Sequence, residues 1–383
     1  MTLTRRTLLS RAALAGGFAL TPRLAFAAAP GEARFVFVIL RGAMDGMSAV
    51  MPVGDPHYAG LRGALAHPPG EAQPVALDST FALHPALARF GQMYAAKQAL
   101  VVHAVASPYR ERSHFDGQNV IETGGTAAYV LKDGWLNRLV AALPRHEPAI
   151  AIAATVPMAL RGSVPVTSYA PSALPQANDE LLQRVAGLYE HDALLHPLWS
   201  EAMDARTLAE GGEGGKANPA ALGKLAAQFL AQPAGPRIAV IEILGWDTHA
   251  QQAGRLATQL KQLDAVFAAL QDGLGSVWAK TTVLAATEFG RTAAINGTGG
   301  TDHGTGGAAF LAGGAVAGGR VVADWPGLSP SQLYENRDLR PTTDLRAVML
   351  GAAAGAFAVD PARLSPALFP GGGVRPVEGL VRA

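Results

Sequence analysis

Patterns of buried strands alternate with helical patterns along most of the chain. Residues 34–40 (RFVFVIL) are apolar at almost every position, which is typical of a central strand covered by helices on both faces. Residues 85–97 and 250–270 carry apolar side chains at the spacing of an amphipathic helix. The other predicted strands are residues 99–105, 236–244, 281–286 and a shorter candidate at 308–311. The alternation predicts an α/β fold with a mostly parallel sheet between helices.

The middle of the chain has a different pattern. Residues 170–235 lack clear strands, and their apolar spacing predicts three helices, around residues 178–193, 195–209 and 217–231. A glycine-rich linker, residues 210–215, lies among them. We interpret this region as a mainly helical insertion or cap within a single α/β domain of residues 28–383.

The first 27 residues have the pattern of an export signal. The paired Arg5 and Arg6 precede a short apolar stretch at 12–20 and a small-x-small site at 25–27. Paired arginines predict the twin-arginine route and its translocase as a partner. We expect cleavage after Ala27 or a nearby alanine and a periplasmic or secreted product; the alternative is an uncleaved N-terminal anchor.

Composition narrows the partners further. Removing residues 1–27, which hold four arginines and no acid, changes the formal net charge from +1 to −3. A mildly acidic protein is a poor partner for nucleic acid or anionic membrane. No later apolar run approaches the length of a membrane span, so none is expected in the mature form. Cysteine is absent, so a metal would require His, Asp, Glu or hydroxyl ligands.

Acidic and histidine side chains follow the predicted strands. In an open parallel sheet, ligands bind outside the carboxyl ends of the strands. Taken alone, an acid before glycine such as Asp45 is usually a turn, and an Asp-x-His pair such as Asp247 and His249 is usually a solvated loop; the adjacent Asp302 and His303 in a glycine-rich loop are a stronger signal. Carboxylates gathered without cations would repel one another, so a metal ion is the partner that the whole set favours. The residues are Asp45, His114, Asp247, His249, Glu288, Asp302 and His303.

Ser113 precedes a predicted helix and would occupy its N-cap position. A hydroxyl there lies among unpaired backbone N–H groups at the positive end of the helix dipole, which favours anions. Arg112 and Arg291 would bind the oxygens of such an anion with bidentate geometry. The alternative is that Ser113 only caps the helix.

Six short motifs stand out along the chain: RGAMDG at 41–46, LHPAL at 83–87, SHFDGQ at 113–118, GWDTH at 245–249, TEFGRT at 287–292 and GTDHG at 300–304. Together they resemble domain-of-unknown-function family 1501. The resemblance covers almost the whole mature chain, with the motifs in order. The family is grouped with the alkaline phosphatase, sulfatase and phosphoglycerate mutase superfamily, which implies a three-layer α/β/α sandwich.

The resemblance implies two divalent metal ions beside a hydroxyl nucleophile. Asp45, Asp302 and His303 resemble the ligands of one ion, and Ser113 is similar to the nucleophile. A second ion would take Asp247 and His249, but only Thr248 separates them and no histidine follows His303. Glu288 or His114 would then supply the missing ligand, and the ion count stays open at one or two.

Two functions follow from these patterns. The first is an exported metal-dependent hydrolase of phosphate or sulfate esters, acting on a small-molecule or glycan substrate. Zinc or manganese suits nitrogen and oxygen ligands, and calcium is possible if the histidines are spectators. The alternative is a non-catalytic periplasmic protein that binds a polyanion, a glycan or a protein partner on the same fold.

Overall fold

The computed structural model describes residues 32–66, 72–144, 147–170, 179–209 and 218–382. The export signal predicted for residues 1–27 and the linker predicted for residues 210–215 lie outside the described residues.

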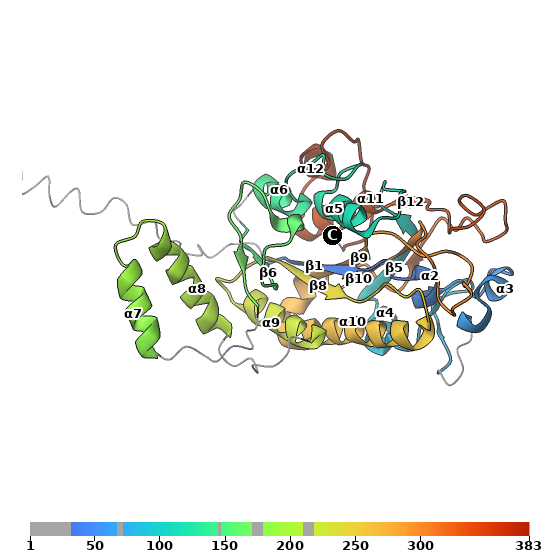
Figure 1. Cartoon of the computed structure of the whole chain (residues 1–383), viewed down its shortest axis with the longest axis horizontal. Coiled ribbons are helices and arrows are strands. Elements are labelled where there is room, and N and C mark those ends of the chain that lie inside the picture. Colours follow the sequence, from blue (N-terminus) through green and yellow to red (C-terminus); the bar gives the residue numbers. More distant parts are fainter. Residues whose placement is uncertain (1–31, 67–71, 145–146, 171–178, 210–217, 383) are drawn as a thin grey trace, which may run out of the picture.

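A nine-stranded sheet forms the middle layer of the protein (Figure 1). Its strand order is β11-β5-β10-β9-β1-β8-β6-β7, and β12 pairs with β5. β10 is antiparallel to β5 and β9, and the other pairings in this sheet are parallel. The mostly parallel sheet is therefore confirmed. The strands are β1 (Arg34–Arg41), β5 (Ala99–Ala106), β6 (Ala149–Ala151), β7 (Thr167–Ser168), β8 (Ile238–Leu244), β9 (Thr281–Thr287), β10 (Gly307–Ala312), β11 (Val321–Val322) and β12 (Thr343–Asp344).

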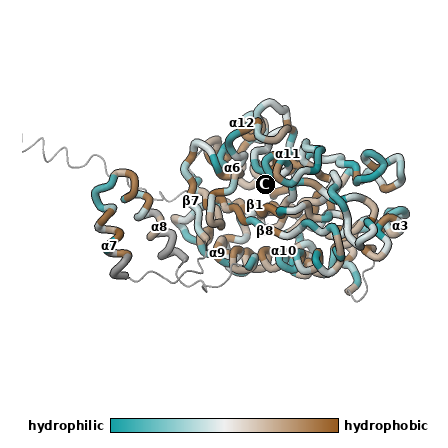
Figure 2. The backbone as a smooth tube through the Cα atoms, in the orientation of Figure 1, coloured by the Kyte–Doolittle hydropathy of each residue, from teal (hydrophilic) through white to brown (hydrophobic). Residues whose placement is uncertain are grey.

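The apolar run of β1 serves two cores because successive side chains of a strand point to opposite faces. Val36 and Val38 pack into the cluster that contains Phe267, on one face of the sheet. Phe35 and Phe37 pack into the cluster that contains Trp135, on the other face. Figure 2 shows hydrophobic residues gathered along the central strands.

Helices cover both faces of the sheet and give the predicted three-layer α/β/α sandwich (Figure 1). One layer contains α4 (Ala88–Ala95), α9 (Pro219–Ala231) and α10 (Gln252–Leu274). The opposite layer contains α5 (His114–Thr123), α6 (Trp135–Ala142), α11 (Leu345–Phe357) and α12 (Pro361–Leu368).

The region predicted as a helical insertion holds three helices that differ in their surroundings. α9 packs along α10 and contributes Phe229 and Leu230 to the core. α7 (Asp179–Tyr189) and α8 (Leu195–Ala209) lie beyond the β7 end of the sheet (Figure 1). α9 is thus part of the sandwich, whereas α7 and α8 extend from it.

Short elements complete the fold. They include a small sheet of order β2-β4-β3. None of the helices in the described ranges has the length and hydrophobicity that crossing a bilayer requires. The short elements are α2 (Gly46–Ala49), α3 (Tyr58–Arg62), β2 (Val50–Met51), β3 (Val75–Ala76), β4 (Ala82–Leu83) and the 3₁₀ helices at Gly63–Leu65, Met158–Leu160 and Gly275–Lys280.

The topology brings the predicted polar loops to one edge. β1, β5, β8 and β9 run in the same direction, so their carboxyl ends lie together. β10 runs in the opposite direction, and Gly307 at its start pairs with Val105 at the end of β5. The segment before β10 therefore reaches the same edge as the loops that follow the parallel strands.

Candidate metal centre

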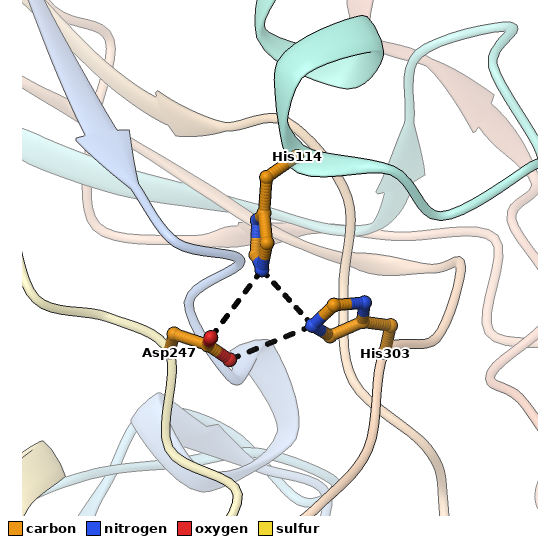
Figure 3. A group of neighbouring side chains, drawn as sticks. All are labelled: His114, Asp247 and His303. Atoms are coloured by element: carbon orange, nitrogen blue, oxygen red, sulfur yellow. Dashed lines mark hydrogen bonds and ion pairs between the residues drawn. The ribbon is translucent and has the colours of Figure 1, made fainter.

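Side chains from three separate segments of the chain converge at this edge (Figure 3). His114 begins α5, Asp247 follows β8, and His303 precedes β10. One ligand atom of each lies within 4.8 Å of the others. Imidazole and carboxylate groups at this spacing form a possible site for zinc or a similar transition metal.

The distances within this group are short. The Nε2 atoms of His114 and His303 are 2.9 Å apart. Asp247 Oδ2 lies 3.6 Å from His114 Nε2, and its Oδ1 lies 3.5 Å from His303 Nε2. The Asp247 side chain is 46% exposed, so the group is open to solvent on that side.

His249 reaches the same point from the loop after β8. Its Nε2 atom is 3.0 Å from His303 Nε2 and 3.1 Å from Asp247 Oδ1. Phe289 packs on the other side, with its ring centroid 5.1 Å from that of His114 and 5.3 Å from that of His303. The group thus has a solvent-exposed side and an aromatic wall.

An acceptor lies behind each of the three imidazole rings. His114 Nδ1 is 2.8 Å from Glu288 Oε1, and His249 Nδ1 is 3.0 Å from Asp302 Oδ1. His303 Nδ1 is 2.9 Å from the carbonyl oxygen of Arg112. The structure therefore places Glu288 and Asp302 against the outer nitrogens of two histidines.

The charges of the site are set by these contacts. Burial alone would raise the pKa of Glu288, but hydrogen bonds from His114 and from backbone N–H groups lower it below its usual range. The pKa of Asp247 is lowered in the same way by Arg291, against the effect of burial. Burial, together with the charges of His114 and Arg291, lowers the pKa of His303. At neutral pH the site has ionised carboxylates and a neutral His303.

Asp45 does not join this group, contrary to the role that we predicted for it. It is the N-cap of α2 and is 1% exposed. Arg62 binds both of its carboxylate oxygens, at 2.5 and 2.9 Å. Ser48 and Gln252 donate to it as well. Because Arg62 balances its charge, Asp45 has the partners of a structural residue.

The two arginines predicted to bind an anion are occupied by protein groups. Arg291 is fully buried and donates to the carbonyl oxygens of Gly42, Ala43 and Thr301, and to Asp247 Oδ1 at 2.5 Å. It organises the loops and holds Asp247 in place.

Arg112 is likewise engaged. It binds Asp338 Oδ2 through Nε at 3.0 Å and through Nη2 at 2.9 Å, and Glu335 at 2.6 Å. Its backbone carbonyl, rather than its guanidinium, contacts His303 of the candidate metal centre.

Ser113 lies at the N-cap of α5, as predicted, directly before His114. Its side chain makes no hydrogen bond to the helix backbone. Its backbone N–H donates to the Tyr109 hydroxyl at 3.1 Å. Capping of the helix by the Ser113 hydroxyl is therefore not what the structure shows.

Sequence reasoning missed three residues that shape the site. Arg62 and Asp338 are buried partners of Asp45 and Arg112, and Gln118 links Glu288 to Arg41. One signal was available for Gln118, since it stands four residues after His114 and therefore on the same face of α5. The sequence around Arg62 and Asp338 carries no comparable signal.

Comparisons with known proteins give a family and several distant structural neighbours. A family described as "Protein of unknown function (DUF1501)" matches residues 97–367. No curated protein matches the chain.

Three solved structures show how low the sequence and structural similarity is. The C-terminal periplasmic domain of EcEptC from Escherichia coli, in complex with Zn, is 9% identical with a TM-score of 0.39, covering 73% of this chain and 72% of that chain. Alkaline phosphatase from the Antarctic bacterium TAB5 is 13% identical with a TM-score of 0.36, covering 76% and 94%. Phosphonate monoester hydrolase of Agrobacterium radiobacter is 9% identical with a TM-score of 0.32, covering 76% and 70%. At this level of similarity, the chemistry of this chain has to be argued from its own side chains.

Proposed function

The chain belongs to the DUF1501 family, and we propose that it is an exported, metal-dependent hydrolase of phosphate or sulfate esters. The observation that carries the proposal is the convergence of His114, Asp247 and His303 at the carboxyl edge of the sheet. A divalent cation there would act as a Lewis acid toward the oxygens of a bound ester. Zinc or manganese matches the nitrogen and oxygen donors.

Ser113 is the proposed nucleophile because it directly precedes His114 at the start of α5. Its Oγ atom would bond to phosphorus or sulfur as the ester bond to the alcohol oxygen breaks. The serine proton passes to solvent, and the alcohol leaves with a proton. Water then cleaves the serine ester and releases inorganic phosphate or sulfate.

The exposure of the site supports a substrate that arrives from solvent. Asp247 and His249 have side chains that are 46% and 45% exposed. A small-molecule or glycan ester would reach them without any opening of the core.

Export is part of the same proposal. Arg5 and Arg6, the apolar stretch at 12–20 and the small-x-small site at 25–27 support the twin-arginine route. Placement in the periplasm or outside the cell can be tested by fractionating cells in which Arg5 and Arg6 are both replaced by lysine. The protein should then remain in the cytoplasm.

The hydrolase activity is tested with purified mature protein, p-nitrophenyl phosphate and p-nitrophenyl sulfate, with added zinc or manganese. Ser113→Ala should abolish turnover and leave bound metal unchanged. Ser331→Ala, which changes an exposed serine outside the site, is the matched control. Turnover that survives Ser113→Ala would contradict the serine mechanism.

One observation favours the second candidate, a non-catalytic periplasmic binding protein on the same fold. Arg112 and Arg291 are both engaged with carboxylates, so neither offers a free guanidinium to a substrate oxyanion. Among the ligands considered for such a protein, this favours a glycan or a protein partner over a polyanion. Absence of turnover of either ester, together with binding of a glycan or a protein partner, would favour this candidate.

A further inference from the structure

The geometry points to a single four-ligand site: we propose that His249 joins His114, His303 and Asp247 around one transition-metal ion, with Glu288 and Asp302 as positioning residues. This inference rests on the metal centre of the proposed function and does not require that esters be hydrolysed.

The first argument comes from the protons of the imidazoles. A carbonyl or an ionised carboxylate only accepts hydrogen bonds, so each Nδ1 atom that faces one must carry the proton of its neutral ring. This applies to His114 opposite Glu288, His249 opposite Asp302, and His303 opposite the Arg112 carbonyl. In the neutral form of each ring, the Nε2 atom is then the nitrogen with the free lone pair, which is the form in which imidazole binds a metal ion.

Those lone pairs face one another. His303 Nε2 is 2.9 Å from His114 Nε2 and 3.0 Å from His249 Nε2. Nitrogen atoms at this distance need a proton or a cation between them. One cation bound by all three nitrogens would satisfy both contacts at once.

The second argument is the shape of the group. Bonds of about 2.0–2.1 Å to a tetrahedral zinc ion place ligand atoms roughly 3.3–3.4 Å apart. The two Nε2 pairs are at 2.9 and 3.0 Å, and Asp247 oxygens are at 3.1, 3.5 and 3.6 Å from the three Nε2 atoms. These five separations lie close to the tetrahedral value, and turning the half-exposed His249 side chain toward His114 would complete the four-ligand site.

The third argument concerns the number of ions. Asp45, which the family resemblance assigns to a separate ion, is bound by Arg62 on both oxygens. Asp302 and Glu288 contact outer nitrogens of the histidines. In the described part of the chain, one group of at least three His, Asp or Glu side chains has the spacing of metal ligands, and its members are His114, Asp247 and His303.

Glu288 is itself fixed. Its carboxylate accepts from Gly42 N–H at 2.8 Å, from the Thr287 hydroxyl at 2.9 Å and from Gln118 at 3.3 Å. Acceptors that hold the outer nitrogen of a metal-binding imidazole set its orientation, and their removal typically lowers metal affinity about 10–100-fold.

The experiment uses the purified mature protein loaded with Zn²⁺ or Co²⁺. Elemental analysis should give one ion per chain, and the Co²⁺ form should show the intense visible absorption of a tetrahedral site. Competition with a chelator should give about a 10–100-fold loss of affinity for Asp302→Asn, and a larger loss for His249→Ala. His196→Ala, an exposed histidine on α8, is the control and should bind as the parent does.

Both test variants change side chains that are about half exposed, so the fold should persist, and circular dichroism verifies it. Two ions per chain, no ion, or parent-like affinity in His249→Ala would each overturn the inference. Ester hydrolysis is measured separately with Ser113→Ala. Failure of that assay with an intact Co²⁺ spectrum counts against the proposed function alone.

Discussion

Asp45→Asn is the sharpest test of how the acidic residues are divided between metal binding and structure. The substitution keeps the size of the side chain, and asparagine remains a good N-cap for α2. It removes the negative charge that faces Arg62, which is fully buried. The variant therefore isolates the charge of the ion pair.

The size of the effect follows from burial. Asp45 is 1% exposed and Arg62 is 0% exposed, so the arginine would be left as an uncompensated buried charge. Breaking such a pair on one side costs about 3–5 kcal/mol of unfolding free energy. That is a large part of the roughly 5–15 kcal/mol that stabilises most proteins. The exposed pair of Arg89 and Asp272, with side chains 36% and 66% exposed, provides the contrast, because such pairs contribute ~0–1 kcal/mol.

The assay is urea unfolding of metal-free protein, followed by circular dichroism, for the parent, Asp45→Asn and Asp272→Asn. We expect a large fall in unfolding free energy for Asp45→Asn and almost none for Asp272→Asn. Metal affinity of the folded Asp45→Asn variant should equal that of the parent. An Asp45→Asn variant that keeps the stability of the parent but no longer binds the metal ion would refute our reasoning and would identify Asp45 as a metal ligand.

Three further predictions follow from the site. Gly42 has φ +119°, and a Cβ atom there would lie 2.7 Å from the Asp247 backbone nitrogen. Gly42→Ala should therefore displace Asp247 and weaken Zn²⁺ binding in a chelator competition. Gly60→Ala is the control and should leave binding unchanged, because a Cβ atom at Gly60 would meet no atom within 4 Å. Folding lowers the pKa values of Asp45 and Glu288 from 3.8 and 4.5, although burial opposes the shift. The stability that these carboxylates contribute is therefore complete above those values and is lost as pH falls through the lower pKa values of the folded state. The urea concentration at the unfolding midpoint should accordingly fall between pH 6 and about pH 3. Zn²⁺ at 100 times its Kd should raise the unfolding free energy by about 2.7 kcal/mol, and absence of any shift in the melting temperature would contradict metal binding to the folded state.

The fold was predictable because its signals are local. An apolar run such as residues 34–40 can pack against helices on both faces when it forms a central strand. β1 does this by placing alternate residues in two separate cores. The region at 170–235 shows the limit of this reasoning. Periodicity indicated its helices, but it could not distinguish α9, which packs along α10, from α7 and α8.

The site was predictable in place but not in detail. The rule that ligands bind at the carboxyl ends of parallel strands identified the loops that carry His114, Asp247 and His303. Which carboxylate faces the centre depends on rotamers and on distant partners. Arg62 stands 17 residues after Asp45, and Asp338 stands 226 residues after Arg112, so neither pairing leaves a pattern in the sequence.

The pairing of charges changes the physical reason for expecting a metal ion. The sequence suggested that several carboxylates gathered at one edge would repel one another unless a cation joined them. In the structure each of these carboxylates already has a cationic or hydrogen-bonding partner, so the acids alone do not require an ion. The stronger reason is the meeting of three Nε2 atoms, because an acceptor at the opposite nitrogen of each ring turns the metal-binding nitrogens toward one point. The pairs are Asp45 with Arg62, Asp247 with Arg291, Asp302 with His249 and Glu288 with His114.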